Sequence, residues 1–466
     1  MEKPHEAALM RLQSRAYAGT VLGVLLLVYT SNFIDRTILG TLGQAVKDDL
    51  GISDTQLGLL QGFAFAVLYT LLGIPLARLA ERRSRVGIIS ICLFVWSGFT
   101  ALCGMAQNFA QLLLYRIGVG IGEAGCSPAA HSLITDYFPA QRRATALSIY
   151  SFGVPLGTMI GAVAGGYIAQ TFGWRQAFLI VGLPGIVLAV VTWIVVREPQ
   201  RGQCDPIESR PLDTAPPAPL GAVVRRLAGC RSFRHMACGA TLISFAAYGG
   251  STFLAPYFLR SFALDYAQVG LIYGLIAGLG AGAGTLLGGR ICDRIGEREP
   301  KWYALFPGLT LLLATPLYLL AWVQDTWTVA AGLLLVAAFL HYMYLGPTFG
   351  VMHNLVDARM RATATALLLF VINFVGLGGG PLFTGWLIDL FSAQAFAPFG
   401  FGEFLTSCPG GRAPQDSGPE LLAACRESLE RGTRGGQFIT HAIIAWAAVH
   451  FLLGARWLRG DLARAG

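Results

Sequence analysis

The sequence predicts an all-α membrane protein that crosses the bilayer twelve times. Of its 466 residues, 54% are hydrophobic and only 13% are charged, and the mean hydropathy is +0.58. Soluble domains carry roughly 25% charged residues, so this composition indicates that lipid is the main solvent. Apolar stretches of about 20 residues, each long enough to cross roughly 30 Å of hydrocarbon, recur along the chain.

Twelve apolar segments are predicted to be transmembrane helices in two bundles of six. Glycine is abundant, at 58 residues, as expected where helices pack closely in lipid through small side chains. The first bundle, 17–196, has predicted spans at 17–41, 54–80, 86–107, 109–137, 143–170 and 174–196. The second bundle, 232–458, has predicted spans at 232–261, 266–291, 302–322, 327–352, 361–391 and 436–458.

The remaining segments are polar. Residues 1–16 are expected to be a cytoplasmic N-terminal segment, because they lack the apolar stretch and cleavage site of a signal peptide. Proline and arginine in 197–231 predict a flexible cytoplasmic linker. A long extracytoplasmic loop, with room for a small helical cap, is predicted at 392–435, and a cytoplasmic tail at 459–466.

The basic residues indicate the orientation. Of the 34 lysines and arginines, 25 lie on the side of the N-terminus and two lie within spans. The opposite side holds Lys47, Arg175, Arg260, Arg412, Arg426, Arg431 and Arg434. By the positive-inside rule both termini are cytoplasmic, which requires an even number of spans. This distribution also argues against nucleic-acid binding, despite a net charge of +8.

The two bundles repeat one another. Residues 78–86 read RLAERRSRV after the second span, and residues 290–298 read RICDRIGER after the eighth. The sequence RATA opens both the fifth span, at Arg143, and the eleventh, at Arg361. Two parallel six-span halves joined by a linker are typical of transporters, in which the substrate site is expected at the interface between the halves.

These motifs resemble those of the major facilitator superfamily, which implies the major facilitator fold over nearly the whole chain. Segments 78–85 and 289–296 resemble its cytoplasmic signature, although the first copy has Ala77 and Ser84 in place of glycine and Glu81 in place of aspartate. Segment 116–123 resembles the family's proton-linked motif, and the glycines and proline of 153–166 resemble its antiporter motif.

A narrower resemblance is to the spinster group, whose animal members export lysophospholipids and sphingosine phosphates. It is carried by 32–36 (NFIDR), 122–124 (GEA) and 173–178 (GWRQAF). The short, lysine-poor, arginine-rich chain is typical of a bacterial member. The resemblance implies a lysophospholipid or sphingolipid as substrate.

Four of the charged residues within the predicted spans stand out. Asp35 and Arg36 lie in the first span, and Arg116 and Glu123 lie two helical turns apart on one face of the fourth. Buried charges are costly in lipid and are functional candidates by default. We expect Asp35 and Glu123 to bind and release protons, and Arg36 or Arg116 to neutralise an anionic headgroup in competition with protons, as in an antiporter. The alternative is a static Arg–Glu pair that holds the spans together.

Other side chains are candidates for the cavity and for a gate. An apolar acyl chain would suit the aromatic residues, and His341 and Asn373 could hydrogen-bond substrate, although the sequence favours a hydrogen-bonded interior histidine for His341. The cavity candidates are Phe65, Tyr69, Tyr248, His341, Tyr342, Phe370 and Asn373. A cytoplasmic gate between the halves is expected from Arg78, Glu81, Arg82, Arg85, Asp293 and Arg294, the alternative being simple positive-inside anchoring.

The nine cysteines show no metal-binding spacing. Cys408 and Cys425 share the predicted extracytoplasmic loop, where oxidation is permitted, and are expected to form a disulfide.

The sequence therefore predicts a proton-coupled secondary transporter of an amphipathic, anionic, lipid-like substrate, working by alternating access. We expect a monomer in the cell membrane, the inner membrane if the source is bacterial, with protons and membrane lipids as partners. No cofactor is expected, since Gly-Lys of a phosphate-binding loop is absent and a proton gradient would supply the energy. An organic-anion or drug exporter is the alternative within transport. An intramembrane enzyme or a non-transporting receptor is the alternative of another class.

Overall fold

The computed structural model describes residues 15–201, 203–204, 219–357 and 360–464, which are helices joined by short turns. Most of the predicted N-terminal segment and much of the predicted linker lie outside these ranges. The chain divides into two compact units. Unit 1 is Met1–Leu39 with Val67–Ala215, and unit 2 is Gly40–Ala66 with Pro216–Gly466. Residues 40–66, which the sequence assigned to the N-terminal bundle, are thus grouped with the C-terminal part of the chain.

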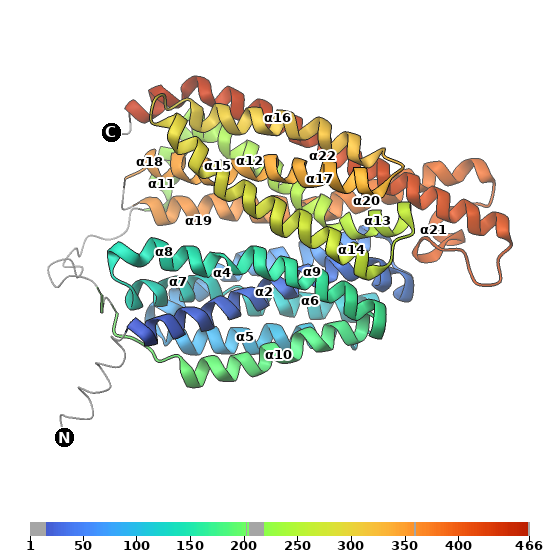
Figure 1. The fold of residues 1–466 in the computed structure, drawn as a ribbon, viewed down its shortest axis with the longest axis horizontal. Coiled ribbons are helices and arrows are strands. Elements are labelled where there is room, and N and C mark those ends of the chain that lie inside the picture. The colour runs from blue at the N-terminus through green and yellow to red at the C-terminus, as the bar shows by residue number, and fades with distance from the viewer. Residues whose placement is uncertain (1–14, 202, 205–218, 358–359, 465–466) are drawn as a thin grey trace. The chain divides into compact units, whose positions relative to one another are not determined.

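Unit 1 consists of helices that follow one another with short connections (Figure 1). They are α2 (Arg15–Leu50, up to Leu39), α4 (Phe63–Arg82, from Val67), α5 (Arg85–Cys103), α6 (Phe109–Glu123), α7 (Cys126–Tyr137), α8 (Ala140–Ser151), α9 (Gly153–Phe172) and α10 (Trp174–Val195).

Unit 2 begins with the C-terminal end of α2 and with α3 (Asp54–Gln61) and continues after the linker. Its longer helices are α11 (Leu220–Gly229), α12 (Arg231–Thr252), α13 (Leu254–Phe262), α14 (Tyr266–Tyr273), α15 (Ala281–Gly296), α16 (Trp302–Trp322), α17 (Trp327–His341), α18 (Leu345–Asn354), α19 (Arg361–Val371), α20 (Gly378–Phe396) and α22 (Pro419–Ala463). Shorter turns are η2 (Gly274–Gly280), η3 (Tyr342–Tyr344), η5 (Ile372–Leu377), η6 (Ala397–Phe399), α21 (Phe404–Ser407) and η7 (Pro409–Gly411).

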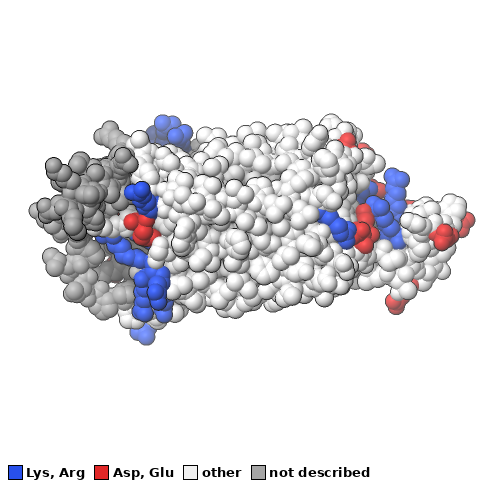
Figure 2. Space-filling view, turned by 90° about the horizontal axis from the view of Figure 1, so that it is seen from below, with Lys and Arg blue, Asp and Glu red and all other residues white. Residues whose placement is uncertain are grey.

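The helices confirm an all-α, multi-pass membrane fold. Within the described residues, ten helices are long and apolar enough to cross a membrane, and the bent pair α12 and α13 gives an eleventh. The remaining predicted span, 109–137, is divided into α6 and α7, each too short to cross alone. Figure 2 shows that the charged side chains on the visible face gather near its two ends, with an uncharged band between them.

The loop predicted at 392–435 is shorter than expected. Helix α20 continues to Phe396 and α22 begins at Pro419, so only 397–418 lie between them. Hydropathy predicts that the last span starts near residue 436, but α22 already begins at Pro419. Its first turns bury Ala424, Cys425 and Leu429 on one face and carry charged side chains on the other. In the predicted linker, α11 is a helix that the proline-rich text did not indicate.

Glycines let helices of unit 1 approach to backbone contact. A Cβ atom at Gly182 of α10 would lie 2.6 Å from the backbone nitrogen of Ala101 and 2.7 Å from the carbonyl oxygen of Ser97, both in α5. Gly157 and Gly161 of α9 approach α2 in the same way. The hydrophobic effect does not drive helices together within lipid. Small residues at such crossings let the helices pack closely, and the van der Waals contacts stabilise the pair.

Gly182→Ala is expected to destabilise the protein by about 1–3 kcal/mol, because the added methyl meets backbone atoms that cannot rotate away. The measurement is the thermal unfolding midpoint in detergent. Gly98→Ala, on α5 with no atom within 4 Å of the added Cβ, is the matched control and should not lower the midpoint. Equal midpoints for the two variants would contradict the close-packing account.

Candidate functional site

Four intramembrane charges meet in unit 1. Helix α2 carries Asp35 and Arg36, and α6 carries Arg116 and Glu123. The Arg36 Nε donates a hydrogen bond to Glu123 Oε2 at 2.6 Å. The charged groups that interact electrostatically with the Asp35 carboxyl are Glu123 and Arg116. The structure thus brings together all four residues that the sequence singled out, and we call them the unit 1 charge cluster.

Asp35 is the most unusual member of this cluster. Its side chain is fully buried, and neither carboxylate oxygen accepts a hydrogen bond of ordinary geometry from the described residues, although the Trp96 side chain interacts with the carboxyl as a weaker donor. A buried ionised carboxylate without such partners costs several kcal/mol. A proton bound to Asp35 would remove that charge, which makes this side chain suited to binding a proton.

Arg36 is the partly exposed cation of the cluster. Its side chain is 20% exposed, while the Glu123 side chain with which it pairs is fully buried. The guanidinium lies 4.7 Å from the centroid of the Tyr69 ring and 5.2 Å from that of Phe33. Arg116, at 2% exposure, lies deeper. An anion reaching the cluster would therefore meet Arg36 beside two aromatic rings.

The seven cavity candidates are divided between the two units. Tyr69 lies with Arg36 in unit 1, and the others belong to unit 2. The buried members are Phe65 and His341, and the half-buried members are Tyr69, Tyr248, Tyr342, Phe370 and Asn373.

His341 is buried at the end of α17. Neither of its ring nitrogens has a hydrogen-bond partner among the described residues. The ring of Tyr342 stacks on the imidazole at a centroid distance of 5.0 Å. The structure therefore does not show His341 as a hydrogen-bonded interior histidine, which the sequence favoured.

The candidates for the cytoplasmic gate differ in their surroundings. Arg78, Arg82, Asp293 and Arg294 are exposed, and the side chain of Glu81 lies outside the description. Arg85 is buried and pairs within unit 1, where it donates to Asp136 and, at 2.7 Å, to Glu198. In this structure Arg85 thus joins α5, α7 and the segment after α10. The cytoplasmic gate between the two halves stays a prediction.

Glu198 completes the Arg85 network at the end of α10. Burial alone would raise the pKa of Glu198, but the Val86 N–H and the Arg85 and Ser84 side chains donate hydrogen bonds to the carboxylate, and its pKa is lowered. The stabilisation that Glu198 contributes is therefore present above its unfolded pKa and is lost as the pH falls through the lower folded value.

A second buried charge network, which the sequence reading missed, lies in unit 2. Asp54, at the start of α3, accepts hydrogen bonds from Lys47 at 2.5 Å and from Arg260 at 2.7 and 3.1 Å. Arg260 also donates to Gln44 at 2.6 Å. Asp389 of α20 accepts the Asp54 N–H at 3.0 Å. We call these residues the Asp54 cluster.

The Asp54 cluster holds the C-terminal end of α2 and the start of α3 against α20. The Thr55 N–H and hydroxyl also donate to Asp389, which places a carboxylate at the N-terminus of α3. A Cβ at Gly58 would lie 2.2 Å from the carbonyl oxygen of Pro381, so α3 and α20 touch through their backbones. One signal was available in the sequence. Asp389 is an ionisable residue within the predicted span 361–391, and the rule that selected Asp35 applies to it equally.

Comparisons with known proteins agree with this architecture. Residues 25–381 match the family model described as Major Facilitator Superfamily. The chain is 35% identical to an MFS-type efflux pump of Mycolicibacterium smegmatis, over 80% of this chain and 85% of that protein. It is 26% identical to a probable L-galactonate transporter of Escherichia coli, over 77% of this chain and 80% of that protein.

A solved structure covers almost the whole chain. It is the crystal structure of a bacterial homolog to the human lysosomal transporter spinster, in an inward-facing and unoccupied conformation. The two chains are 34% identical, the match covers 96% of this chain and 99% of that one, and the TM-score is 0.88. The resemblance to the spinster group is thereby confirmed.

Proposed function

Since the chain belongs to the major facilitator superfamily and is a multi-pass membrane transporter, we propose that it couples proton movement to transport of an amphipathic, anionic, lipid-like molecule. The observation that carries this proposal is the buried Asp35, whose carboxylate oxygens accept no hydrogen bond of ordinary geometry from the described residues, beside Arg116 and Glu123. A carboxyl group in such a place gains from binding a proton and gains from hydration when the cluster opens to water.

The Arg36–Glu123 pair supplies the link between anion and proton. An anion that binds Arg36 takes the place of the Glu123 carboxylate, which is then left buried without its cation. A proton on Glu123 removes that unfavourable charge, so anion binding promotes proton binding and, by thermodynamic linkage, proton binding promotes anion binding. This pairing favours co-transport of anion and proton over the exchange expected from the sequence.

Two observations favour an amphipathic anion. The Arg36 guanidinium lies 5.2 Å from the centroid of the Phe33 ring and 4.7 Å from that of the Tyr69 ring, so aromatic surface lies next to the cation that would bind the anion. The similar structure is that of a spinster homolog, and the spinster resemblance implies lysophospholipids or sphingolipids. A sugar acid is the second candidate, because a probable L-galactonate transporter is among the relatives and its substrate carries the same negative charge.

The test is binding and transport of three probes by the purified protein. Lysophosphatidylglycerol represents a single-chain anionic lipid, galactonate a sugar acid, and ethidium a cationic drug. Saturable, protein-dependent binding and transport of lysophosphatidylglycerol in proteoliposomes is expected. Transport of galactonate alone would replace the lipid by a sugar acid, and transport of ethidium alone would refute the anion site.

Arg36→Gln is expected to weaken binding of lysophosphatidylglycerol by roughly ten- to a hundredfold, the equivalent of one charge-assisted hydrogen bond of about 1.5–3 kcal/mol. Quenching of tryptophan fluorescence measures the affinity. Arg36→Lys keeps the charge but loses the planar guanidinium, so it should bind with intermediate affinity. An unchanged dissociation constant in Arg36→Gln would exclude Arg36 from the substrate site.

A further inference from the structure

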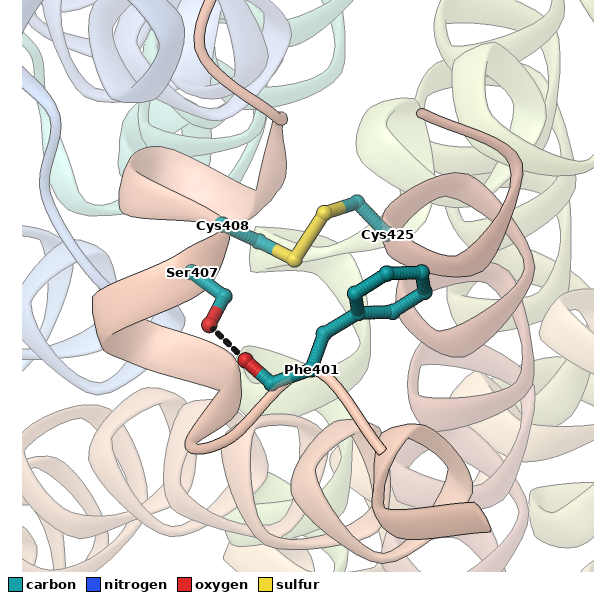
Figure 3. The surroundings of a disulfide bond; sticks show 4 residues. All are labelled: Phe401, Ser407, Cys408 and Cys425. Carbon is teal, nitrogen blue, oxygen red and sulfur yellow. Dashed lines mark hydrogen bonds between the residues drawn. A yellow bond between two sulfur atoms is a disulfide. The ribbon is translucent and has the colours of Figure 1, made fainter. Parts of the chain in front are cut away.

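The segment 397–429, which we call the cap, is a small folded element of unit 2. A disulfide joins Cys408 to Cys425 of α22, with their Cα atoms 5.8 Å apart. The buried core of the cap and its base consists of Phe396, Phe404, Cys408, Ala424, Cys425 and Leu429. Figure 3 shows the Phe401 ring beside the disulfide and the Ser407 hydroxyl donating to the Phe401 carbonyl at 2.7 Å. The disulfide and this core fix the cap to α20 and α22.

The cap loop lies directly on the C-terminal end of α2. A Cβ at Gly410 would lie 3.0 Å from the carbonyl oxygen of Lys47 and 3.3 Å from the Cα of Gly51. Gly410 and Gly411 have φ values of +66° and +85°, which L side chains rarely adopt. Two adjacent glycines therefore let the cap backbone press against the last turn of α2.

An ion pair joins the same two elements. Arg412 Nη2 lies 2.5 Å from Asp48 Oδ2, where the Asp48 side chain is 15% exposed and that of Arg412 is 67% exposed. Arg412 also places a cation at the C-terminal end of α2, where the helix dipole favours positive charge. The cap thus covers and pairs with the turn of α2 that supplies Lys47 to the Asp54 cluster.

The segment under the cap belongs to unit 2 by its contacts but continues into unit 1 at both of its ends. Residues 40–66 join unit 1 between Leu39 and Gly40 and between Ala66 and Val67. Alternating access requires the two units to move relative to one another, so this segment must either bend at those junctions or leave unit 2. Leaving unit 2 breaks the Asp48–Arg412 pair, because the disulfide holds the cap on α20 and α22.

We propose that the cap is a clamp that holds residues 44–58 on unit 2 and opposes the opening of this end of the transporter. The clamp rests on the proposed transport function and on the alternating access that the sequence predicts for it, and it supplies a control element for that cycle. Its two parts are the disulfide, which keeps the cap loop in place, and the contact of that loop with α2 through Gly410 and Arg412. Release of the clamp exposes the Asp54 cluster to water.

Hydrogen exchange measured by mass spectrometry on the full chain in detergent tests the clamp. Arg412→Ala should speed exchange of amides in 44–58 by roughly two- to fivefold, as expected for a partly exposed ion pair. The double variant Cys408→Ser/Cys425→Ser should speed it by roughly tenfold or more, because the loop is no longer tied to α22. Arg426→Ala, which removes an exposed arginine of the cap, is the matched control and should leave exchange in 44–58 unchanged.

The outcomes separate the clamp from the transport proposal. Faster exchange confined to 397–429 in both variants would show that the cap stabilises only itself, and the clamp would be overturned. If the double variant also exchanges faster in α5 and α10, it has lost global stability. In that case the exchange of residues 44–58 in the milder Arg412→Ala variant decides whether the clamp exists. The experiment needs neither substrate nor proton gradient, so a transporter with another substrate or ion would leave its result standing.

Discussion

Asp35→Asn is expected to abolish proton-driven accumulation of substrate while the protein stays folded. Asparagine has nearly the shape of aspartic acid but cannot release or take up a proton, so the unit 1 charge cluster loses the buried carboxyl group that accepts no hydrogen bond of ordinary geometry from the described residues. One proton carried across a gradient of one pH unit supplies about 1.4 kcal/mol, which supports an accumulation ratio of about ten. In proteoliposomes loaded with a pH gradient, the wild type should approach that ratio for lysophosphatidylglycerol, and Asp35→Asn should stay near one.

Asp416→Asn provides the control for this experiment. Asp416 is an exposed aspartate of the cap, so the same chemical change is made away from the unit 1 charge cluster. Its accumulation ratio should equal that of the wild type. Accumulation by Asp35→Asn at the wild-type ratio would exclude Asp35 from proton coupling, whatever the substrate proves to be.

Arg260→Met is expected to destabilise unit 2 by about 3–5 kcal/mol, because it removes one of the two cations that pair with the buried Asp54 carboxylate and leaves Lys47 as the other. Arg260 donates to both carboxylate oxygens of Asp54 and to Gln44 and Thr433, and only 8% of the residue is exposed. The thermal unfolding midpoint in detergent should fall by several degrees. Hydrogen exchange in residues 44–58 should rise in the same variant, because the Asp54 cluster no longer holds them.

Arg431→Met is the matched control, since it makes the same substitution on the N-terminal part of α22. Arg431 pairs with Glu427 at the surface, where the two side chains are 66% and 45% exposed. Such pairs are worth about 0–1 kcal/mol, so the midpoint should move little. If Arg260→Met unfolds at the same temperature as Arg431→Met, the Asp54 cluster does not stabilise this part of the protein.

The sequence was most informative where the free energy of placing a residue in lipid is large. Charges cost several kcal/mol in lipid, so Asp35, Arg36, Arg116 and Glu123 stood out from apolar text, and the structure brings them together. The same cost of charge in lipid makes the spans apolar and keeps most basic residues in loops. The all-α multi-pass fold is predicted from these two patterns.

The sequence was less informative where partners lie far apart in the chain. Asp54 and Asp389 are separated by hundreds of residues, and although Asp389 lies within a predicted span, the sequence does not show that the two residues meet until α3 and α20 are packed together. The length of α22 was hidden for another reason. Its N-terminal part is amphipathic and folds against the cap, so it carries no continuous apolar signal. Arg85 was assigned to a gate from its motif alone, and only the structure shows its pairing with Asp136 and Glu198.

The most direct test of the proposed function measures proton movement during substrate transport. Proteoliposomes with the pH-sensitive dye pyranine inside receive lysophosphatidylglycerol outside, below its micellar concentration and with no imposed pH gradient. We expect the lumen to acidify as the anion enters, with Asp35→Asn liposomes and protein-free liposomes as controls that show no protein-dependent change. Alkalinisation during entry would establish exchange in place of co-transport, and entry of the lipid with no change in luminal pH would contradict proton coupling altogether.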